Sequence, residues 1–323
     1  MGDEPDYSKL EEIFFPFSLN EKQKIINSNN KFVHYTSAEN ALKIIDTREF
    51  WMRNALCMND YSEINYGLQL LNSYFRDEQK RNKFFEVLMA CGVNYDIINI
   101  VIKKFDDSSL FIRFETYVSC FSVHDTKNED DVGRLSMWRA YGRTPARVAL
   151  VLNSALFFGE SDALEAYLFP VSYSDTVFFN ELNNIVSNME NNRDYIKSIN
   201  PGIIAECIYR VFLFGITCTK HKGFSEEQEW RVLHFPEIWK SEVLKPDVVT
   251  IDGAPQKIFK IPLADIPDEG LVGVELPSLI DRIIIGPSLN PWPIQGAFIH
   301  ALMKAGVHDA AERVFVSEIP LRT

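Results

Sequence analysis

The chain has 323 residues, of which 46% are hydrophobic and 13% aromatic, and its formal net charge is −12 at pH 7. This composition can bury a substantial core in one large domain or two modest ones, and it excludes a disordered or low-complexity chain. The negative charge disfavours extended binding to duplex nucleic acid, because no Lys/Arg run marks a local basic groove. Binding of a short single-stranded nucleic acid or of a small molecule remains compatible with this negative charge.

Cysteine usage and the N-terminal sequence predict a cytoplasmic protein without membrane contact. The cysteines are scattered, odd in number and free of any CxxC pair, as is typical of reduced intracellular thiols. They are Cys57, Cys91, Cys120, Cys207 and Cys218. The first residues, MGDEPDYSKL, are acidic and lack the apolar core of a signal peptide. The most apolar helical stretch lies between Arg210 and Lys220 and is too short to span a bilayer.

The first elements expected along the chain are a lead-in, a strand and a capped helix. Residues 1–30 are interpreted as a polar, partly helical lead-in, and KFVHY (31–35) as a strand. Thr36 with Glu39 three residues later matches a capping box, so a helix is expected to begin at Thr36. A second strand is expected at EFWMRNAL, residues 49–56.

The rest of the chain predicts two long helical segments and a series of separate strands. The helical segments are residues 61–105 and 175–219. Strands are expected at TYVSCFSV (116–123), RVALVLN (147–153), AYLFPVSY (166–173), EWRVLHF (229–235), KIFKIPL (257–263), DRIIIGP (281–287) and RVFVSEI (313–319). Because strands and helices do not alternate regularly, a doubly wound parallel sheet is disfavoured and the predicted fold class is α+β.

Common catalytic signatures are missing from the sequence. There is no GxGxxG after a strand, no GxxxxGK[ST], no HExxH and no GxSxG. The histidines show no metal-ligand spacing, so no metal site is expected.

The junction between the strand at 31–35 and the helix expected to begin at Thr36 is one candidate ligand site. The N-terminus of a helix presents unpaired N–H groups that attract phosphate without a lysine, and His34 and Tyr35 would flank such a ligand. Arg53 is the nearest candidate cation for a phosphate, while Asn59 is first interpreted as a turn residue. From these residues alone, a core histidine beside an ordinary cap is the favoured alternative.

The second candidate site is the pair Glu227 and Glu229 in EEQEWRVL. Residues two apart on a strand face the same side, and neighbouring carboxylates can share acid–base work and charge stabilisation. The alternative is that both glutamates lie in a solvated acidic turn. The aromatic and apolar residues that follow Glu229 disfavour full solvation of Glu229.

Trp138 and Tyr141 in MWRAYG could stack on a flat ring or pack a short helix against a sheet.

Several short motifs occur in an order that resembles an uncharacterised bacterial family common near phage-defence genes. They are HYTS, NALKII, FW, MND, VSCFS, MWRAYG, VALVL, EEQEWRVL, IIIGP and VFVSEIPLR, and the resemblance runs from about residue 32 to the C-terminus. That family is in turn similar to the ADP-ribosyltransferase superfamily, including DarT-type enzymes that modify nucleic-acid bases. The resemblance implies one domain over residues 31–323, with a mixed β-sheet core and large helical insertions at 61–105 and 175–219.

The resemblance also implies roles for the candidate residues. His34 would hold the nicotinamide ribose of NAD, and Thr36 with the helix start would take the adenosine side or the pyrophosphate. Glu229 would be the catalytic carboxylate, and Glu227 would orient or deprotonate the acceptor.

The resemblance implies a catalytic triad of His34, a middle residue and Glu229, and it leaves the middle residue open. The second strand carries Trp51 and Arg53 where the superfamily often has Tyr or Ser, so Tyr141 is a candidate replacement. The expected NAD site therefore consists of His34, Tyr35, Thr36, Arg53, Asn59 and Tyr141.

The resulting expectation is an NAD-dependent ADP-ribosyltransferase, a toxin-like effector of anti-phage defence that consumes NAD as a substrate. Its expected acceptor is single-stranded RNA or DNA, and an antitoxin or chaperone protein is a candidate partner. Two alternatives stay open: an NAD glycohydrolase with water as acceptor, and a non-catalytic sensing or binding module with the same fold.

Overall fold

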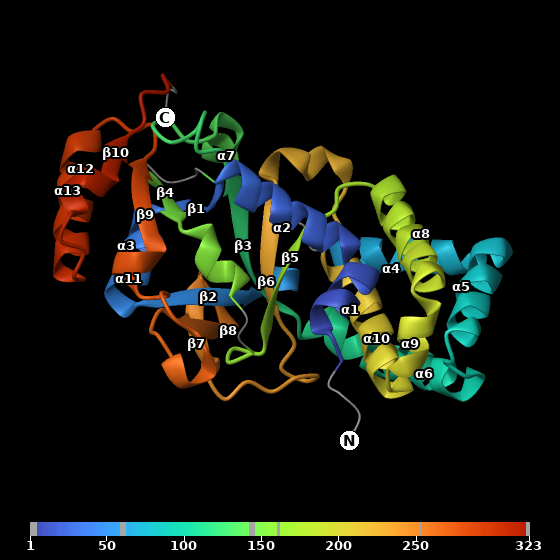
Figure 1. The fold of residues 1–323 in the computed structure, drawn as a ribbon. Helices are drawn as coiled ribbons and strands as arrows, with labels where there is room; N and C mark the ends of the chain where they lie inside the picture. The colour runs from blue at the N-terminus through green and yellow to red at the C-terminus, as the bar shows by residue number, and fades with distance from the viewer. Residues whose placement is uncertain (1–4, 59–62, 142–145, 160–161, 252, 321–323) are drawn as a thin grey trace. The chain divides into compact units, whose positions relative to one another are not determined.

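The computed structural model describes residues 5–58, 63–141, 146–159, 162–251 and 253–320, and the chain forms two compact units (Figure 1). The helical unit comprises residues 1–23, 55–116 and 169–225, and the sheet unit comprises residues 24–54, 117–168 and 226–323. The lead-in over 1–30 and the single domain over 31–323 remain predictions.

The helical unit is built around α10, a helix that is apolar on most of its surface. Its helices are α1 (Tyr7–Phe14), the start of α2 (Pro16–Ser28), α4 (Glu63–Arg76), α5 (Glu78–Ala90), α6 (Tyr95–Phe114), α8 (Asp175–Asn191), α9 (Arg193–Ser198) and α10 (Pro201–Thr217), with the short η1 (Ala55–Cys57). Side chains cap the helix starts: the Asp77 carboxylate accepts the N–H groups of Gln79 and Lys80, and Asn94 caps α6. The helical character expected for residues 61–105 and 175–219 is confirmed where the structure describes them, and their status as insertions remains a prediction.

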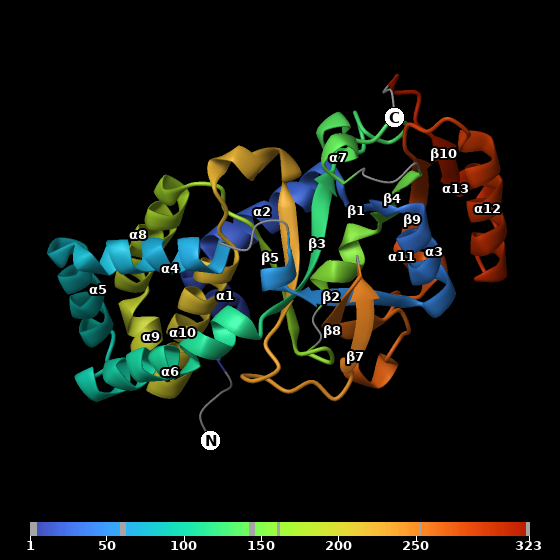
Figure 2. The same cartoon turned by 180° about the vertical axis from the view of Figure 1, so that it is seen from behind.

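The described ranges contain ten strands, which belong to the sheet unit except for the last two residues of β5. They are β1 (Lys31–Ser37), β2 (Glu49–Asn54), β3 (Tyr117–His124), β4 (Arg147–Leu152), β5 (Ala166–Pro170), β6 (Glu229–His234), β7 (Lys245–Ile251), β8 (Ala254–Pro262), β9 (Ile280–Ile285) and β10 (Val314–Val316). The order is β10-β9-β4-β1-β3-β2-β8-β7, with β6 paired to β3 and β5 paired to β6 (Figure 2). Strand β10 is parallel to β9, whereas β1 is antiparallel to both β3 and β4. The sheet is therefore mixed, and the predicted α+β class is confirmed.

The two faces of this sheet pack against different elements. Side chains that project from opposite faces cannot contact each other, so the face of each candidate residue matters. On one side, here called the core face, Phe32, Phe121 and Trp230 belong to the main hydrophobic cluster, which α3 (Ala38–Thr47) and α12 (Pro291–Lys304) cover. On the other side, here called the α7 face, Val33 and Tyr35 pack with residues of α7 (Leu135–Ala140). The remaining short elements of the unit are η2 (Ser154–Phe158), η3 (Lys222–Glu227, which begins in the helical unit), η4 (Pro267–Glu269), α11 (Leu276–Leu279) and α13 (Ala310–Arg313).

Helix α3, which the sequence predicts to begin at Thr36, begins two residues later, at Ala38. Thr36 and Ser37 still pair with β4, opposite Val148 and Arg147, so the strand continues through them. Ser37 is the N-cap, and its hydroxyl accepts the Asn40 N–H at 3.1 Å. The predicted capping box at Thr36 is therefore wrong.

Strand β7 was not expected from the sequence. It pairs with β8 at the edge of the sheet and is largely exposed, so it lacks the apolar alternation that marks a half-buried strand. Among the helices of the described ranges, none is long and apolar enough to cross a membrane.

Candidate functional site

Glu229 lies at the first position of β6, on the α7 face of the sheet. It is in register with Ser122 of β3, which is in register with Val33 of β1, and paired residues of antiparallel strands project to the same side. Only 5% of Glu229 is exposed. Its Oε1 atom accepts a hydrogen bond from Nε of Arg231 at 2.8 Å, and Arg231 is equally buried. The strand thus presents a buried carboxylate with a guanidinium beside it.

The Glu229–Arg231 pair is more informative about function than about stability. Removing two charges from water costs about as much free energy as their attraction returns, so well-packed apolar residues are often an equal or better solution. The arginine does fix the orientation of the carboxylate through a charge-assisted hydrogen bond. A positioned, charge-compensated carboxylate is suited to stabilising a positive charge that develops in a reaction.

Glu227 does not lie on the same strand as Glu229. It is the last residue of η3, and Gln228 between the two glutamates has a left-handed backbone with φ of 43°. The expectation that both side chains project from one continuous strand is therefore wrong. Glu227 is half-buried, and its Oε1 atom lies 3.4 Å from the hydroxyl of Tyr141, which packs against the cluster of the α7 face.

Arg134, which the sequence did not single out, holds the segment that precedes Glu229. Its guanidinium donates to the carboxylate of Glu129 at 2.6 Å and to the carbonyl of Val123 at 2.7 Å. It also donates to the carbonyl of Glu226 at 2.8 Å and to Oε1 of Gln228 at 3.1 Å. One side chain therefore connects the end of β3 to the loop that carries the glutamates. An arginine closing the mainly acidic run HDTKNEDDVGR was the signal available in the sequence.

Tyr35 joins this arrangement through its hydroxyl. The hydroxyl accepts the backbone N–H of Arg134 at 2.8 Å, and the ring lies edge-on to Trp138 at 4.9 Å. Burial raises the pKa of the Tyr35 phenol above its ordinary value of 10.0, with the hydrogen bond from Arg134 opposing the shift. Tyr35 is therefore a neutral residue that aligns the start of α7 with β1.

His34 projects from the opposite, core face of the sheet. Its ring packs against Phe50 and Phe121 at centroid distances of 5.6 and 5.9 Å, and Nδ1 lies 3.1 Å from the carbonyl oxygen of Cys120. Burial lowers the pKa of His34, so the ring is neutral at pH 7, and Nδ1 is assigned as the N–H donor to that carbonyl. The structure does not bring His34 together with Glu229.

The other predicted NAD contacts are dispersed. Thr36 alternates with Tyr35 and therefore projects from the same face as His34. Arg53 is opposite Val118, at the other end of β3 from Ser122, and donates from Nε and Nη2 to Oε1 of Gln256 at 3.3 and 3.1 Å. Asn59 lies outside the described residues. Of the predicted site residues, the structure connects Tyr35, Tyr141 and Glu227 through α7 and the Arg134 network, and Glu229 projects from the same face of the sheet.

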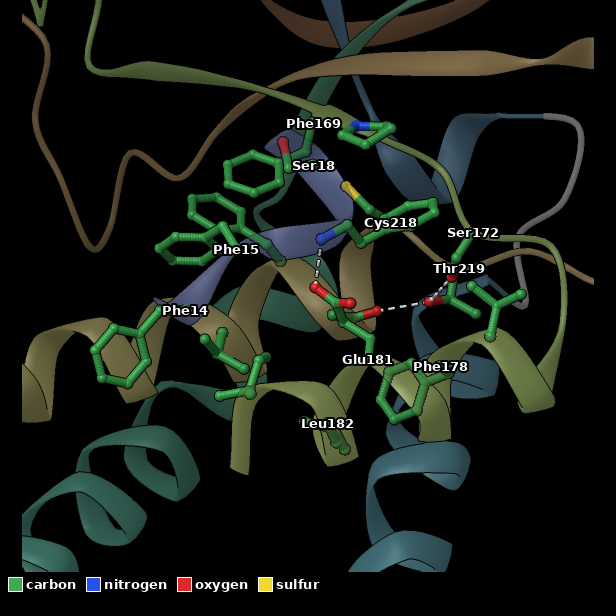
Figure 3. A pocket seen from close by; sticks show the side chains of 17 residues that line it. Phe14, Phe15, Ser18, Phe169, Ser172, Phe178, Glu181, Leu182, Cys218 and Thr219 are labelled. Carbon is green, nitrogen blue, oxygen red and sulfur yellow. Dashed lines mark hydrogen bonds between the residues drawn. The ribbon is translucent and has the colours of Figure 1, made fainter. Parts of the chain in front are cut away.

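A second carboxyl away from water, that of the half-buried Glu181 of α8, lies in the helical unit and was also not singled out from the sequence. It borders a cavity of about 70 Å³ whose lining includes Phe15, Phe169 and Phe178 (Figure 3). Its Oε1 atom accepts the backbone N–H of Phe17 at 2.9 Å. Burial raises the pKa of Glu181 to about 7, against the opposing effect of that hydrogen bond.

Comparison with known proteins gives one match. A family model described as "Protein of unknown function (DUF2971)" matches residues 137–232, a segment that contains Tyr141, Glu227 and Glu229. Neither the curated proteins nor the solved structures compared with the chain match it. Within the described ranges, no group of three or more His, Cys, Asp or Glu residues could hold a metal ion.

Proposed function

We propose that the protein is an NAD-dependent ADP-ribosyltransferase that modifies nucleic acid, with Glu229 as its catalytic carboxylate. The observation that carries the proposal is the buried carboxylate of Glu229, held 2.8 Å from Nε of Arg231 on the α7 face. The ordered motifs that resemble ADP-ribosyltransferases support the same residue. The resemblance to a family common near phage-defence genes supports a toxin-like role, for which an antitoxin or chaperone would be the protein partner.

The reaction would break the bond between ribose C1′ and the nicotinamide nitrogen of NAD. Nicotinamide leaves as a neutral ring with the bonding electrons, and positive charge develops on the ribose, as in glycoside cleavage. The carboxylate of Glu229 would stabilise that charge and accept a hydrogen bond from the 2′-hydroxyl. Arg231 would act as a positioning residue, because it restricts the rotation of this carboxylate.

Glu227 would serve the acceptor side of the site. A nitrogen of the acceptor base attacks C1′ and loses its proton, and Glu227 would take that proton. The half-buried position of Glu227 on the loop before β6, beside the Tyr141 hydroxyl, supports this division of labour. His34 has no part in this mechanism, because it projects from the core face.

Single-stranded RNA or DNA is the proposed acceptor. A net charge of −12 opposes long duplex contacts, whose affinity comes mainly from neutralised phosphates. A base must also leave its stack before its ring can be attacked, and this step costs least in a single strand. Label from NAD should therefore appear on single strands far more than on a duplex of the same sequence.

The experiment is incubation of the full-length protein with NAD labelled in its adenosine part, with RNA, DNA or protein fractions. Label on nucleic acid supports the proposal, and label found on protein alone would place the acceptor on a side chain. Nicotinamide release with no labelled acceptor would support the NAD glycohydrolase alternative, and no NAD consumption would support the non-catalytic module. Glu227→Gln should preserve nicotinamide release and reduce label transfer; equal loss of both would contradict the proposed roles.

A further inference from the structure

The helical unit contains a larger cavity between α4, α5, α6 and α10. Its volume is about 360 Å³, within the roughly 300–1,000 Å³ range of small-molecule sites, which often lie between the helices of a bundle. An apolar cavity of about 150 Å³ accepts benzene, so this one has room for an apolar body on the order of a dozen carbon atoms. Five phenylalanines line it: Phe75, Phe84, Phe85, Phe105 and Phe212.

The aromatic wall of this cavity is fixed by contacts among its own rings. The ring of Phe75 lies edge-to-face with Phe84 at a centroid distance of 5.2 Å and with Phe212 at 5.5 Å. Phe105 lies edge-to-face with Phe212 at 5.8 Å. This geometry is the one that aromatic pairs favour, and the rings come from four different helices. The site is therefore preformed, and a ligand would bind without ordering the wall.

A cation is among the residues that line this mainly apolar site. Arg81 of α5 is among the lining residues, and 40% of its side chain is exposed. Its guanidinium lies 3.9 Å from the carboxylate of Glu78, which is 81% exposed, and an exposed pair at that distance is weak. A guanidinium binds a carboxylate through two parallel hydrogen bonds, so Arg81 can take an anionic head group.

The polar lining residues also include Asp106 of α6, which would favour an ammonium head group instead. Asp106 is exposed, so water screens its charge, whereas Arg81 is half-buried and its charge is screened less. Branched aliphatic residues such as Leu88, Val101 and Ile208 line the wall together with the rings. An unbranched alkyl chain can follow such a mixed surface by rotating about its single bonds.

We propose that this cavity binds a medium-chain fatty acid, with its alkyl chain among the phenylalanines and its carboxylate on Arg81. The site is separate from the proposed NAD chemistry, because all of its lining residues belong to the helical unit. Fatty-acid binding is therefore expected whether or not the protein cleaves NAD.

Isothermal titration calorimetry on the full-length protein tests the proposal with three probes below their aggregation concentrations: dodecanoate, dodecanol and dodecylammonium. Dodecanoate should bind at one site, at least tenfold more tightly than dodecanol and dodecylammonium. Arg81→Gln should weaken dodecanoate binding by about ten- to a hundredfold and leave dodecanol unchanged, because hydrogen bonds to a charged group are lost. Arg113→Gln, on α6 but outside the lining, is the matched control and should bind dodecanoate like the wild type.

A second pair of variants tests whether the probe occupies the cavity. Val101→Phe adds volume inside it and should abolish dodecanoate binding without lowering the melting temperature, because it fills space. Leu88→Phe on α5 serves the same purpose if the first variant does not fold. The proposal is overturned if dodecanoate gives no saturable heat, if the folded filled variants bind it normally, or if Arg81→Gln binds it unchanged. Tighter binding of dodecylammonium would assign the head group to Asp106 and also overturn the proposal.

Discussion

Two glutamates, the half-buried Glu181 of the helical unit and the buried Glu229 of the sheet unit, differ in what compensates their charge. Glu181 borders a cavity lined by aromatic side chains and accepts a backbone N–H, and burial raises its pKa to about 7. Glu229 is buried beside a guanidinium whose Nε donates to it at 2.8 Å. Desolvation alone favours the protonated carboxyl, whereas a cation in hydrogen-bond contact favours the carboxylate.

This difference separates two kinds of chemistry. A carboxyl that protonates near neutral pH suits a proton donor or a pH-dependent contact. A carboxylate held by an arginine suits the stabilisation of a positive charge on a substrate. Burial by itself therefore does not identify a catalytic residue, and the partner of the buried group is the more informative observation.

The largest expected effect on stability comes from breaking the Glu229–Arg231 pair. Arg231→Met leaves a buried carboxylate without this guanidinium and should lower the free energy of unfolding by about 3–5 kcal/mol. Replacing both residues, Glu229→Leu with Arg231→Met, should recover most of that loss, because no charge then stays buried at this position. Urea denaturation of the three proteins measures both effects, and a loss below about 1 kcal/mol in the single variant would show that the pair is not electrostatically important.

The next effect concerns the pH dependence contributed by Glu181. Its pKa is higher in the folded chain than the ordinary value of 4.5, so the folded state binds the proton more tightly. Its stabilising contribution is complete below about pH 4.5 and is lost as the pH rises through about 7. Glu181→Gln should remove this dependence, which is on the order of 2 kcal/mol between pH 5 and 8.

Urea denaturation at both pH values checks this prediction. Glu86→Gln, an exposed glutamate of α5, is the control and should keep the dependence of the wild type. An unchanged difference between pH 5 and 8 in Glu181→Gln would contradict the assignment.

The smallest of these effects is expected at His34. His34→Ala removes ring contacts with Phe50 and Phe121 and a hydrogen bond to a backbone carbonyl. The free energy of unfolding should fall by about 1–2 kcal/mol, while the KM for NAD in the folded protein stays unchanged. A raised KM with an unaltered melting temperature would restore His34 as a ligand of NAD and contradict the placement of the site on the α7 face.

The sequence predicted strands that are rich in buried apolar residues and missed what depends on distant partners. The stretches TYVSCFSV and RVALVLN indicated β3 and β4, which are buried on both faces, whereas β7 is exposed and carries no such signal. The helix start was misplaced because pairing with β4 extends β1 through Ser37.

The candidate site was predicted in part for the same reason. Glu229 was identified from its place before an apolar strand, whereas Arg134 contacts residues up to 94 positions away, which local spacing cannot show. The left-handed Gln228, which separates Glu227 from the strand, has no signature in the sequence. His34 and Tyr35 were both expected beside one ligand, although neighbouring residues of a strand project from opposite faces. The face of Glu229 depends on the register between β3 and β6.

The measurement that tests the central claim most directly is NAD consumption by Glu229→Gln compared with Glu226→Gln. Both variants remove one carboxylate from the same segment, but Glu226 is exposed and Arg134 contacts its backbone carbonyl. In protein shown to be folded by its melting curve, Glu229→Gln should slow nicotinamide release by at least about a hundredfold, equivalent to about 3 kcal/mol of transition-state stabilisation. Glu226→Gln should match the wild type. Unchanged nicotinamide release by folded Glu229→Gln would contradict the assignment of Glu229 as the catalytic carboxylate.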